Sequence, residues 1–168
     1  TIDVTQVFST GRAFAALRTD GSVVTWGDQT YGGNSGAVAA KLDGSVEVTH
    51  LFSTGGAFAA LHSDGSVVTW GALSWGGNSS AVATLLDGTI DVTQVFSNGY
   101  AFAALRADGS VVTWGDVSYG GNSSAVASLL DGTIDVTRVF STGFAFAALR
   151  ADGSVVTWGD PTYGGNSG

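Results

Sequence analysis

Short apolar runs of about five residues alternate with Gly, Asp and Ser turns along the whole chain, and the same order returns four times. The run Asp-Gly-Ser-Val-Val-Thr-Trp-Gly begins at Asp20, Asp64, Asp108 and Asp152, a period of 44 residues. A period of this size marks one supersecondary unit copied along a chain, each copy leaning on its neighbours. We therefore expect a single repeat domain over 1–168, with repeats 1–44, 45–88, 89–132 and 133–168, the last incomplete.

The third repeat, 89–132, predicts three strands. Residues 89–97 are rich in β-branched and aromatic side chains and predict the first strand. Asn98-Gly99 predicts a turn in which the glycine adopts positive φ, and 101–106 predict the second strand. Asp108-Gly109 is a strong hairpin signal and leads into a third strand, antiparallel to the second. Its alternation places Val112 and Trp114 on one face and Val111 and Thr113 on the other.

A short helix is predicted after the loop that follows this third strand. Ser123 or Ser124 can cap a helix over 125–130, and Gly132 can stop it. The spacing of its apolar residues predicts one buried stripe, made of Val126, Leu129 and Leu130. A helix of under two turns is stable only when it packs on a sheet. The fold class is therefore all-β, with four repeats of three to four antiparallel strands and a helical turn.

The order Ala-Phe-Ala-Ala-Leu-x-x-Asp-Gly-Ser-Val-Val-Thr-Trp-Gly in every copy resembles the repeat of the regulator of chromosome condensation family. Its core runs from Leu105 through Asp108-Gly109 to Trp114-Gly115. The resemblance is to the bacterial tandem-array type of repeat, and it implies a β-propeller with four-stranded blades assembled partly from adjacent repeats. The family normally closes with seven blades, whereas this chain holds four repeats. The family's histidine before Ala-Leu is also replaced, by Phe14, Phe58, Phe102 and Phe146 or the alanines beside them.

The charge and composition of the chain disfavour several kinds of partner and site. Six Lys and Arg against 14 Asp and Glu give a formal net charge of −8, which disfavours nucleic acid and anionic membranes as partners. The absence of cysteine excludes disulfides, thiolate metal sites and thiol nucleophiles. We expect no membrane insertion, because the sequence contains no apolar run near 18 residues. Thr1 is not an initiator methionine, so we expect a piece of a longer protein, secreted or on a bacterial cell surface.

Comparison of the repeats separates constant from variable positions. The tryptophans of the Trp-Gly pairs stay constant and are interpreted as core aromatics: Trp26, Trp70, Trp114 and Trp158. The turn after the first strand varies most, and its residues are candidates for ligand binding: Arg12, Gly56, Tyr100 and Phe144. A second variable position follows Trp-Gly and adds four weaker candidates: Gln29, Leu73, Val117 and Pro161. A tolerant loop tip explains such variation equally well.

Carboxylates and histidines raise two other possibilities for a site, Ca²⁺ binding and catalysis. Asp28, Asp116 and Asp160 are weak Ca²⁺ candidates with Asn34, Asn122 and Asn166 nearby, although loop capping by these aspartates is favoured. We attribute the four hairpin aspartates to turn geometry. A catalytic site would rest on His50, His62 and Asp64 in the second repeat, and we expect no enzyme activity, no catalytic residue and no other cofactor.

The sequence is consistent with two functions. The first is a non-enzymatic binding or adhesion module of an extracellular bacterial protein, presenting its variable loops to a carbohydrate or protein partner. The second is self-assembly into an oligomeric propeller or fibre through an open repeat edge, because the fourth copy lacks the helical segment and an uncovered edge favours pairing. The near-identity of the copies fits a recent duplication or an engineered consensus array.

Overall fold

The computed structural model describes residues 3–167, and each repeat forms one antiparallel sheet of three strands in sequence order. This confirms the lower of the two strand numbers expected. The four-stranded blades that the resemblance implies are not found in this part of the chain. The four sheets consist of β1 (Val4–Ser9), β2 (Ala13–Arg18) and β3 (Val23–Gly27); β4 (Val48–Ser53), β5 (Ala57–His62) and β6 (Val67–Gly71); β7 (Val92–Ser97), β8 (Ala101–Arg106) and β9 (Val111–Gly115); and β10 (Val136–Ser141), β11 (Ala145–Arg150) and β12 (Val155–Gly159).

The helical turns are all 3₁₀ rather than α-helical. One set follows the third strands, in a segment expected to be loop: η1 (Gln29–Tyr31), η3 (Leu73–Trp75), η5 (Val117–Tyr119) and η7 (Pro161–Tyr163). The other set lies where a helix was predicted and comprises η2 (Gly36–Lys41), η4 (Ser80–Leu85) and η6 (Ser124–Leu129). This second segment ends at the outer edge of each of the first three sheets, where, for example, the carbonyl of Leu130 accepts from Val111 N at 2.9 Å. It occupies the place of a fourth strand.

Two local expectations are wrong. The turn at Asn98-Gly99 does not use positive φ at the glycine; instead Asn98 Oδ1 accepts from the backbone N of Tyr100 and Ala101, both at 2.8 Å. The helical segment does not bury one stripe, because Leu130 is buried whereas Leu129 is 41 % exposed. The 3₁₀ winding places residues differently from an α-helix. Ser123 is the N-cap but makes no side-chain capping bond, since its Oγ accepts from Thr113 at 3.0 Å.

The apolar cores lie between successive sheets. The first core joins Ala15 and Leu17 of one repeat to Phe58 and Trp70 of the next, and the other two cores repeat this arrangement. Each sheet therefore has a leading face, which packs on the preceding repeat, and a trailing face, which packs on the following one. The alternation predicted for the third strand is confirmed, because Val112 packs with the second sheet and Val111 with the fourth.

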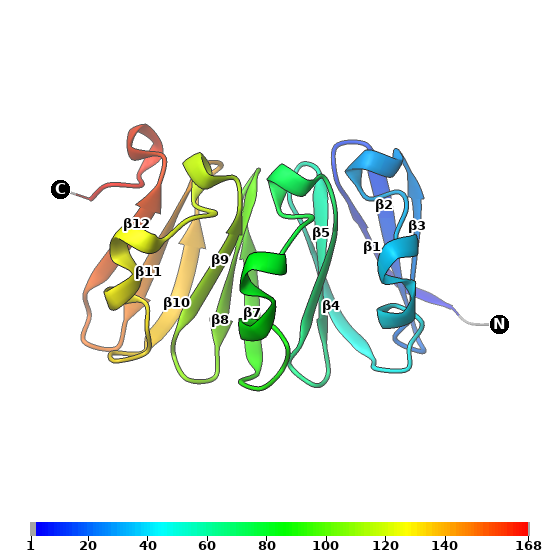
Figure 1. The fold of residues 1–168 in the computed structure, drawn as a ribbon, viewed down its shortest axis with the longest axis horizontal. Helices are drawn as coiled ribbons and strands as arrows, with labels where there is room; N and C mark the ends of the chain where they lie inside the picture. The colour runs from blue at the N-terminus through cyan, green and yellow to red at the C-terminus, as the bar shows by residue number, and fades with distance from the viewer. Residues whose placement is uncertain (1–2, 168) are drawn as a thin grey trace.

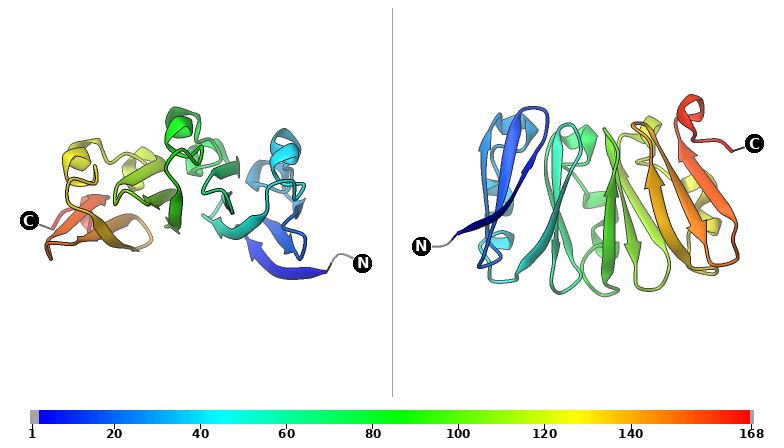
Figure 2. Two further views of the ribbon diagram at one scale, coloured as in Figure 1. Left: turned by 90° about the horizontal axis from the view of Figure 1, so that it is seen from below. Right: turned by 180° about the vertical axis from the view of Figure 1, so that it is seen from behind.

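The four sheets stand side by side in an open arc, with the termini at opposite ends (Figures 1 and 2). The 3₁₀ segments η2, η4 and η6 lie along the outer side of the arc (Figure 2). Because the first and last sheets do not meet, the leading face of β1–β3 and the trailing face of β10–β12 are uncovered. Among residues 3–167 no helix is long and apolar enough to cross a membrane.

Candidate functional site

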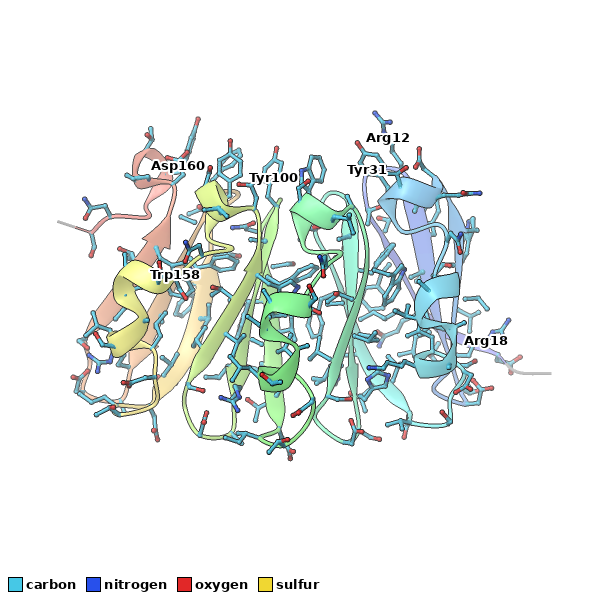
Figure 3. All side chains as sticks on the ribbon, viewed as in Figure 1. Arg12, Arg18, Tyr31, Tyr100, Trp158 and Asp160 are labelled. Atoms are coloured by element: carbon cyan, nitrogen blue, oxygen red, sulfur yellow. The ribbon has the colours of Figure 1, made fainter. Side chains whose placement is uncertain are left out.

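The four variable turn residues lie at one end of the molecule. Each follows the first strand of its repeat, and Arg12 and Tyr100 are seen along the upper edge in Figure 3. The short helices after the third strands reach the same edge, so Tyr31 lies beside Arg12 (Figure 3). The fold thus brings together the two variable positions of each repeat and the aromatic residue that ends each short helix.

These aromatic residues form a continuous row across all four repeats. The Arg12 guanidinium lies 4.7 Å from the centre of the Tyr31 ring, and Tyr31 meets Trp75 edge-on at 5.8 Å. Trp75 meets Tyr100 at 4.9 Å, and Tyr100 lies 5.6 Å from Phe144. The row continues through Tyr119 and ends at Tyr163, whose ring centre is 4.6 Å from that of Phe144. We call this row the aromatic ladder: Arg12, Tyr31, Trp75, Tyr100, Tyr119, Phe144 and Tyr163.

In the ladder, a smaller side chain at one position is offset by a larger side chain at the neighbouring position. In the second repeat the turn residue is Gly56, and the aromatic position carries Trp75 where the other repeats carry Tyr. A Cβ at Gly56 would lie 2.5 Å from the Trp75 ring, so the indole fills the space that a side chain would need. Gly56 is buried and contributes room rather than contact. In the second repeat this turn position is therefore packed, whereas Arg12 at the same position of the first repeat is exposed.

Hydrogen bonds connect the backbone segments that carry the ladder. The amide of Gly11 donates to Gly55 O at 2.8 Å, and Gly55 and Gly99 donate in the same way to the next repeat. Within repeats, Thr54 Oγ1 donates to Trp75 O at 2.9 Å, and Asn98 Nδ2 donates to Tyr119 O at 2.6 Å. These bonds join each turn both to its own short helix and to the adjacent turn. The backbone that carries the rings is therefore hydrogen-bonded on both sides.

The weaker candidates lie beside the ladder at the first position of each short helix: Gln29, Leu73, Val117 and Pro161. Leu73 and Val117 are 71 % and 69 % exposed, whereas most ladder residues are half-buried. Leu73, Val117 and Pro161 add apolar surface beside the ladder, whereas Gln29 adds a polar group.

The acidic candidates cap these short helices. Asp28, Asp116 and Asp160 each accept from the backbone N two residues later, at 2.9, 2.9 and 2.8 Å. This confirms the capping interpretation, and Ala72 simply leaves its helix without a side-chain cap. Asn34 and Asn122 make the same kind of turn. Residues 3–167 contain no cluster of three or more His, Cys, Asp or Glu that could hold a metal, so Ca²⁺ binding stays a prediction.

The second-repeat histidines have separate environments. His50 is exposed and its Nδ1 lies 3.2 Å from Thr49 Oγ1. His62 is buried, with Nε2 2.7 Å from Lys41 O and Nδ1 3.2 Å from Ser66 Oγ. It lines an outer cleft of about 450 Å³ between η2 and η4.

A catalytic reading of His62 and Ser66 is disfavoured by the repeat symmetry. Ser66 Oγ donates to Asp64 at 2.7 Å, and the same serine to aspartate bond occurs in all four hairpins. The bond from Ser66, followed by its backbone N–H, holds the pKa of Asp64 below its ordinary value. In the third hairpin desolvation by burial raises the pKa of Asp108, the hydrogen bonds from Ser110 lower it, and the net pKa is still below its ordinary value. These aspartates act as turn acceptors, as the sequence predicted.

The core aromatics show one departure from expectation. Trp70, Trp114 and Trp158 are buried and stack on the phenylalanine of the same sheet at 5.3 to 5.4 Å. Each also donates from Nε1 to a glycine carbonyl of the preceding repeat at 3.1 Å. Trp26 and Phe14 stack in the same way but are 46 % and 45 % exposed, because no sheet precedes theirs in residues 3–167. The assignment of Trp26 to a core is therefore wrong for this structure.

Antiparallel sheets of one repeat, stacked face to face in an arc, define a β-propeller repeat fold of the RCC1-like type. Human WBSCR16 is similar, with 22 % identity, a TM-score of 0.61 and coverage of 94 % of this chain and 48 % of that one. The structure of Kap60 bound to yeast RCC1 (Prp20) gives 18 % identity and a TM-score of 0.64, covering 93 % and 43 %.

The ectodomain of the receptor kinase CR4 from Physcomitrella patens gives 15 % identity and a TM-score of 0.57, covering 94 % and 39 %. This chain thus spans less than half the length of these proteins. No protein-family model matches the sequence, and no curated protein matches it.

Proposed function

We propose that this chain is a non-catalytic binding module whose aromatic ladder docks a protein partner. The observation that carries the proposal is the continuity of the ladder, from the cation of Arg12 to the ring of Tyr163, across four repeats. Tyr, Trp and Arg are the residues that dominate binding energy at protein interfaces. The hydrogen bonds that join the turns and short helices lower the entropy lost on binding. The fold supports a binding role in general, since one structural relative is yeast RCC1 solved with Kap60.

The ring geometry favours a protein over a carbohydrate. Tyr100 contacts Trp75, Tyr119 and Phe144, so its ring faces are shared with other rings. A sugar stacks on an open aromatic face, whereas a protein side chain also uses ring edges and hydroxyl groups. The negative net charge of the chain favours a partner with a basic or neutral surface. An extracellular location and a role in adhesion are part of the same proposal.

The test is selection followed by substitution. A displayed random-peptide library and an array of neutral and acidic oligosaccharides serve as probes for the whole chain. Arg12→Ala and Tyr163→Ala remove exposed members of the ladder, and Val46→Ala removes an exposed apolar group outside it. We expect selected peptides to lose at least tenfold in affinity with the ladder variants and to keep it with Val46→Ala. Equal losses for all three variants would contradict the proposal, and binding of sugars alone would favour the carbohydrate alternative.

A second candidate function, self-assembly, is favoured by a different observation. The apolar leading face of the first sheet is exposed, although the same positions are buried in every other sheet.

A further inference from the structure

We propose that the leading face of the first sheet binds the trailing face of the fourth sheet of a second copy of this chain, and that two copies close into a ring of eight sheets. The observations behind this proposal are the exposed faces of the two end sheets, and they are separate from those behind the aromatic ladder. The three interfaces within the chain show what covers each face, and they supply the argument for the occupant.

The leading face of the first sheet is apolar and half uncovered. Val4, Val7, Phe14 and Trp26 are 52 %, 56 %, 45 % and 46 % exposed. The same positions in the second sheet, which packs on a preceding repeat, are at most 4 % exposed: Val48, Leu51, Phe58 and Trp70. In the other sheets, the side chains at these positions are covered by the preceding repeat. A repeat of the same kind therefore fits the exposed face of the first sheet.

The trailing face of the fourth sheet carries the matching vacancies. Gly32, Gly76 and Gly120 each receive the phenylalanine ring of the next repeat, which lies 2.5 to 2.6 Å from the Cβ that an alanine would add. At Gly164 nothing lies within 4 Å of that point in residues 3–167. Phe140 on the same face is 53 % exposed, whereas Phe8, Phe52 and Phe96 pack against the cores between sheets.

The hydrogen-bonding groups at the two faces also correspond. In each internal interface the tryptophan Nε1 donates to a glycine carbonyl 38 residues earlier, as Trp158 does to Gly120. Continuing this register past the fourth repeat pairs Trp26 of a second copy with the carbonyl of Gly164. In the same register Gly143 N would donate to Gly11 O of the second copy, as Gly99 N does to Gly143 O at 3.2 Å.

The contact is heterologous, since two different faces meet. A heterologous contact gives a ring if its rotation closes and a filament if it does not. Propellers close with about four to eight blades. Residues 3–167 form four sheets in an open arc, so two copies of this stretch supply eight sheets, a number within this range. Three copies would exceed it.

The junction between copies should be weaker than the internal interfaces. Within the chain, each interface includes a buried leucine of the connecting segment, as Leu42 and Leu86 show. No such leucine follows Val155 in residues 3–167, and Val155 is 55 % exposed. Association should therefore depend on concentration, and it should bury Trp26.

The test measures the mass of the 168-residue chain by light scattering over a wide concentration range, together with tryptophan emission. We expect twice the mass of one chain at high concentration, with a shift of emission to shorter wavelength as Trp26 is buried. Phe14→Glu alters the leading face, Phe140→Glu alters the trailing face, and Leu129→Glu is a control on an exposed helical turn. Each of the first two variants should be monomeric and folded by circular dichroism, and the control should dimerise.

Mixing Phe14→Glu with Phe140→Glu restores one unaltered junction, and the mixture should form a heterodimer. A head-to-head contact would instead leave Phe140→Glu dimeric. A monomer at all concentrations would overturn the pairing. Polymers that grow with concentration would support the pairing but overturn the closed ring.

Discussion

Replacing Phe102 by Ala should destabilise the chain far more than the same change at Phe14, although the two residues hold the same position in their repeats. Phe102 is fully buried, stacks on Trp114 at 5.3 Å, and covers Gly76 of the preceding repeat. Its loss leaves a cavity between two sheets, which costs about 3–5 kcal/mol for a buried phenylalanine. Phe14 faces solvent with nearly half its surface, so its loss leaves no closed cavity and costs about 1 kcal/mol.

The two variants are compared by urea unfolding and by thermal unfolding, each monitored by tryptophan emission and circular dichroism. The protein concentration must lie below the range in which light scattering shows association, so that only the single chain is measured. For a chain of this size each kcal/mol shifts the melting temperature by about 2–4 °C, which makes a difference of several degrees between the variants. Equal losses of stability would refute the reasoning that the constant phenylalanine is stabilised by contact with the preceding sheet.

Two further predictions concern glycines and acid. Gly76 and Gly164 both have φ near +100°, so an alanine at either position costs about 1–2 kcal/mol in backbone strain. Only the alanine at position 76 also meets a ring, that of Phe102. Thermal unfolding should therefore show the larger loss of stability for Gly76→Ala. The pKa values of Asp20, Asp64 and Asp152 are lowered below 3.8, mainly by the hydroxyls of Ser22, Ser66 and Ser154. The unfolded chain takes up these protons first, so this stabilisation is complete above about pH 4 and is lost as the pH falls through the lowered values. Urea unfolding at a series of pH values should show that the free energy of unfolding falls less at acid pH when the three serines are replaced by Ala. An unchanged fall would contradict the assignment.

Much of the fold could be predicted from the sequence because the repeat reports each element four times. The second and third strands and the Asp-Gly hairpins follow from alternation and turn chemistry, which act locally. The errors arose where local signals compete. At Asn98-Gly99 the asparagine side chain makes the turn, so the glycine does not need positive φ. In 124–129 the α-helical spacing was assumed, although the segment winds as a 3₁₀ helix.

The candidate site was predicted in part. The variable turns were found, but the aromatic residues beside them were missed because they are nearly constant and lie 19 residues further along the chain. One signal was present in the sequence: the repeat with Gly56 is also the repeat in which Tyr is replaced by Trp75. A simultaneous loss and gain of ring volume in one repeat indicates that the two positions touch. The continuity of the ladder depends on how sheets stack, which no single repeat encodes.

The ladder and the pairing of copies are connected through the repeat geometry. The turn side chains of the first, third and fourth repeats contact the aromatic residue of their own repeat, as Phe144 contacts Tyr163. Tyr100 and Phe144 also contact the aromatic residue of the preceding repeat, as Phe144 contacts Tyr119. Head-to-tail pairing would therefore place Arg12 of a second copy beside Tyr163, where the guanidinium can lie against a ring as it does at Tyr31. The ladder would then run without a break around a closed ring. Arg12→Ala should consequently weaken both partner binding and pairing, whereas Phe140→Glu, which lies on the trailing face away from the ladder, should abolish pairing and leave partner binding by the single chain intact.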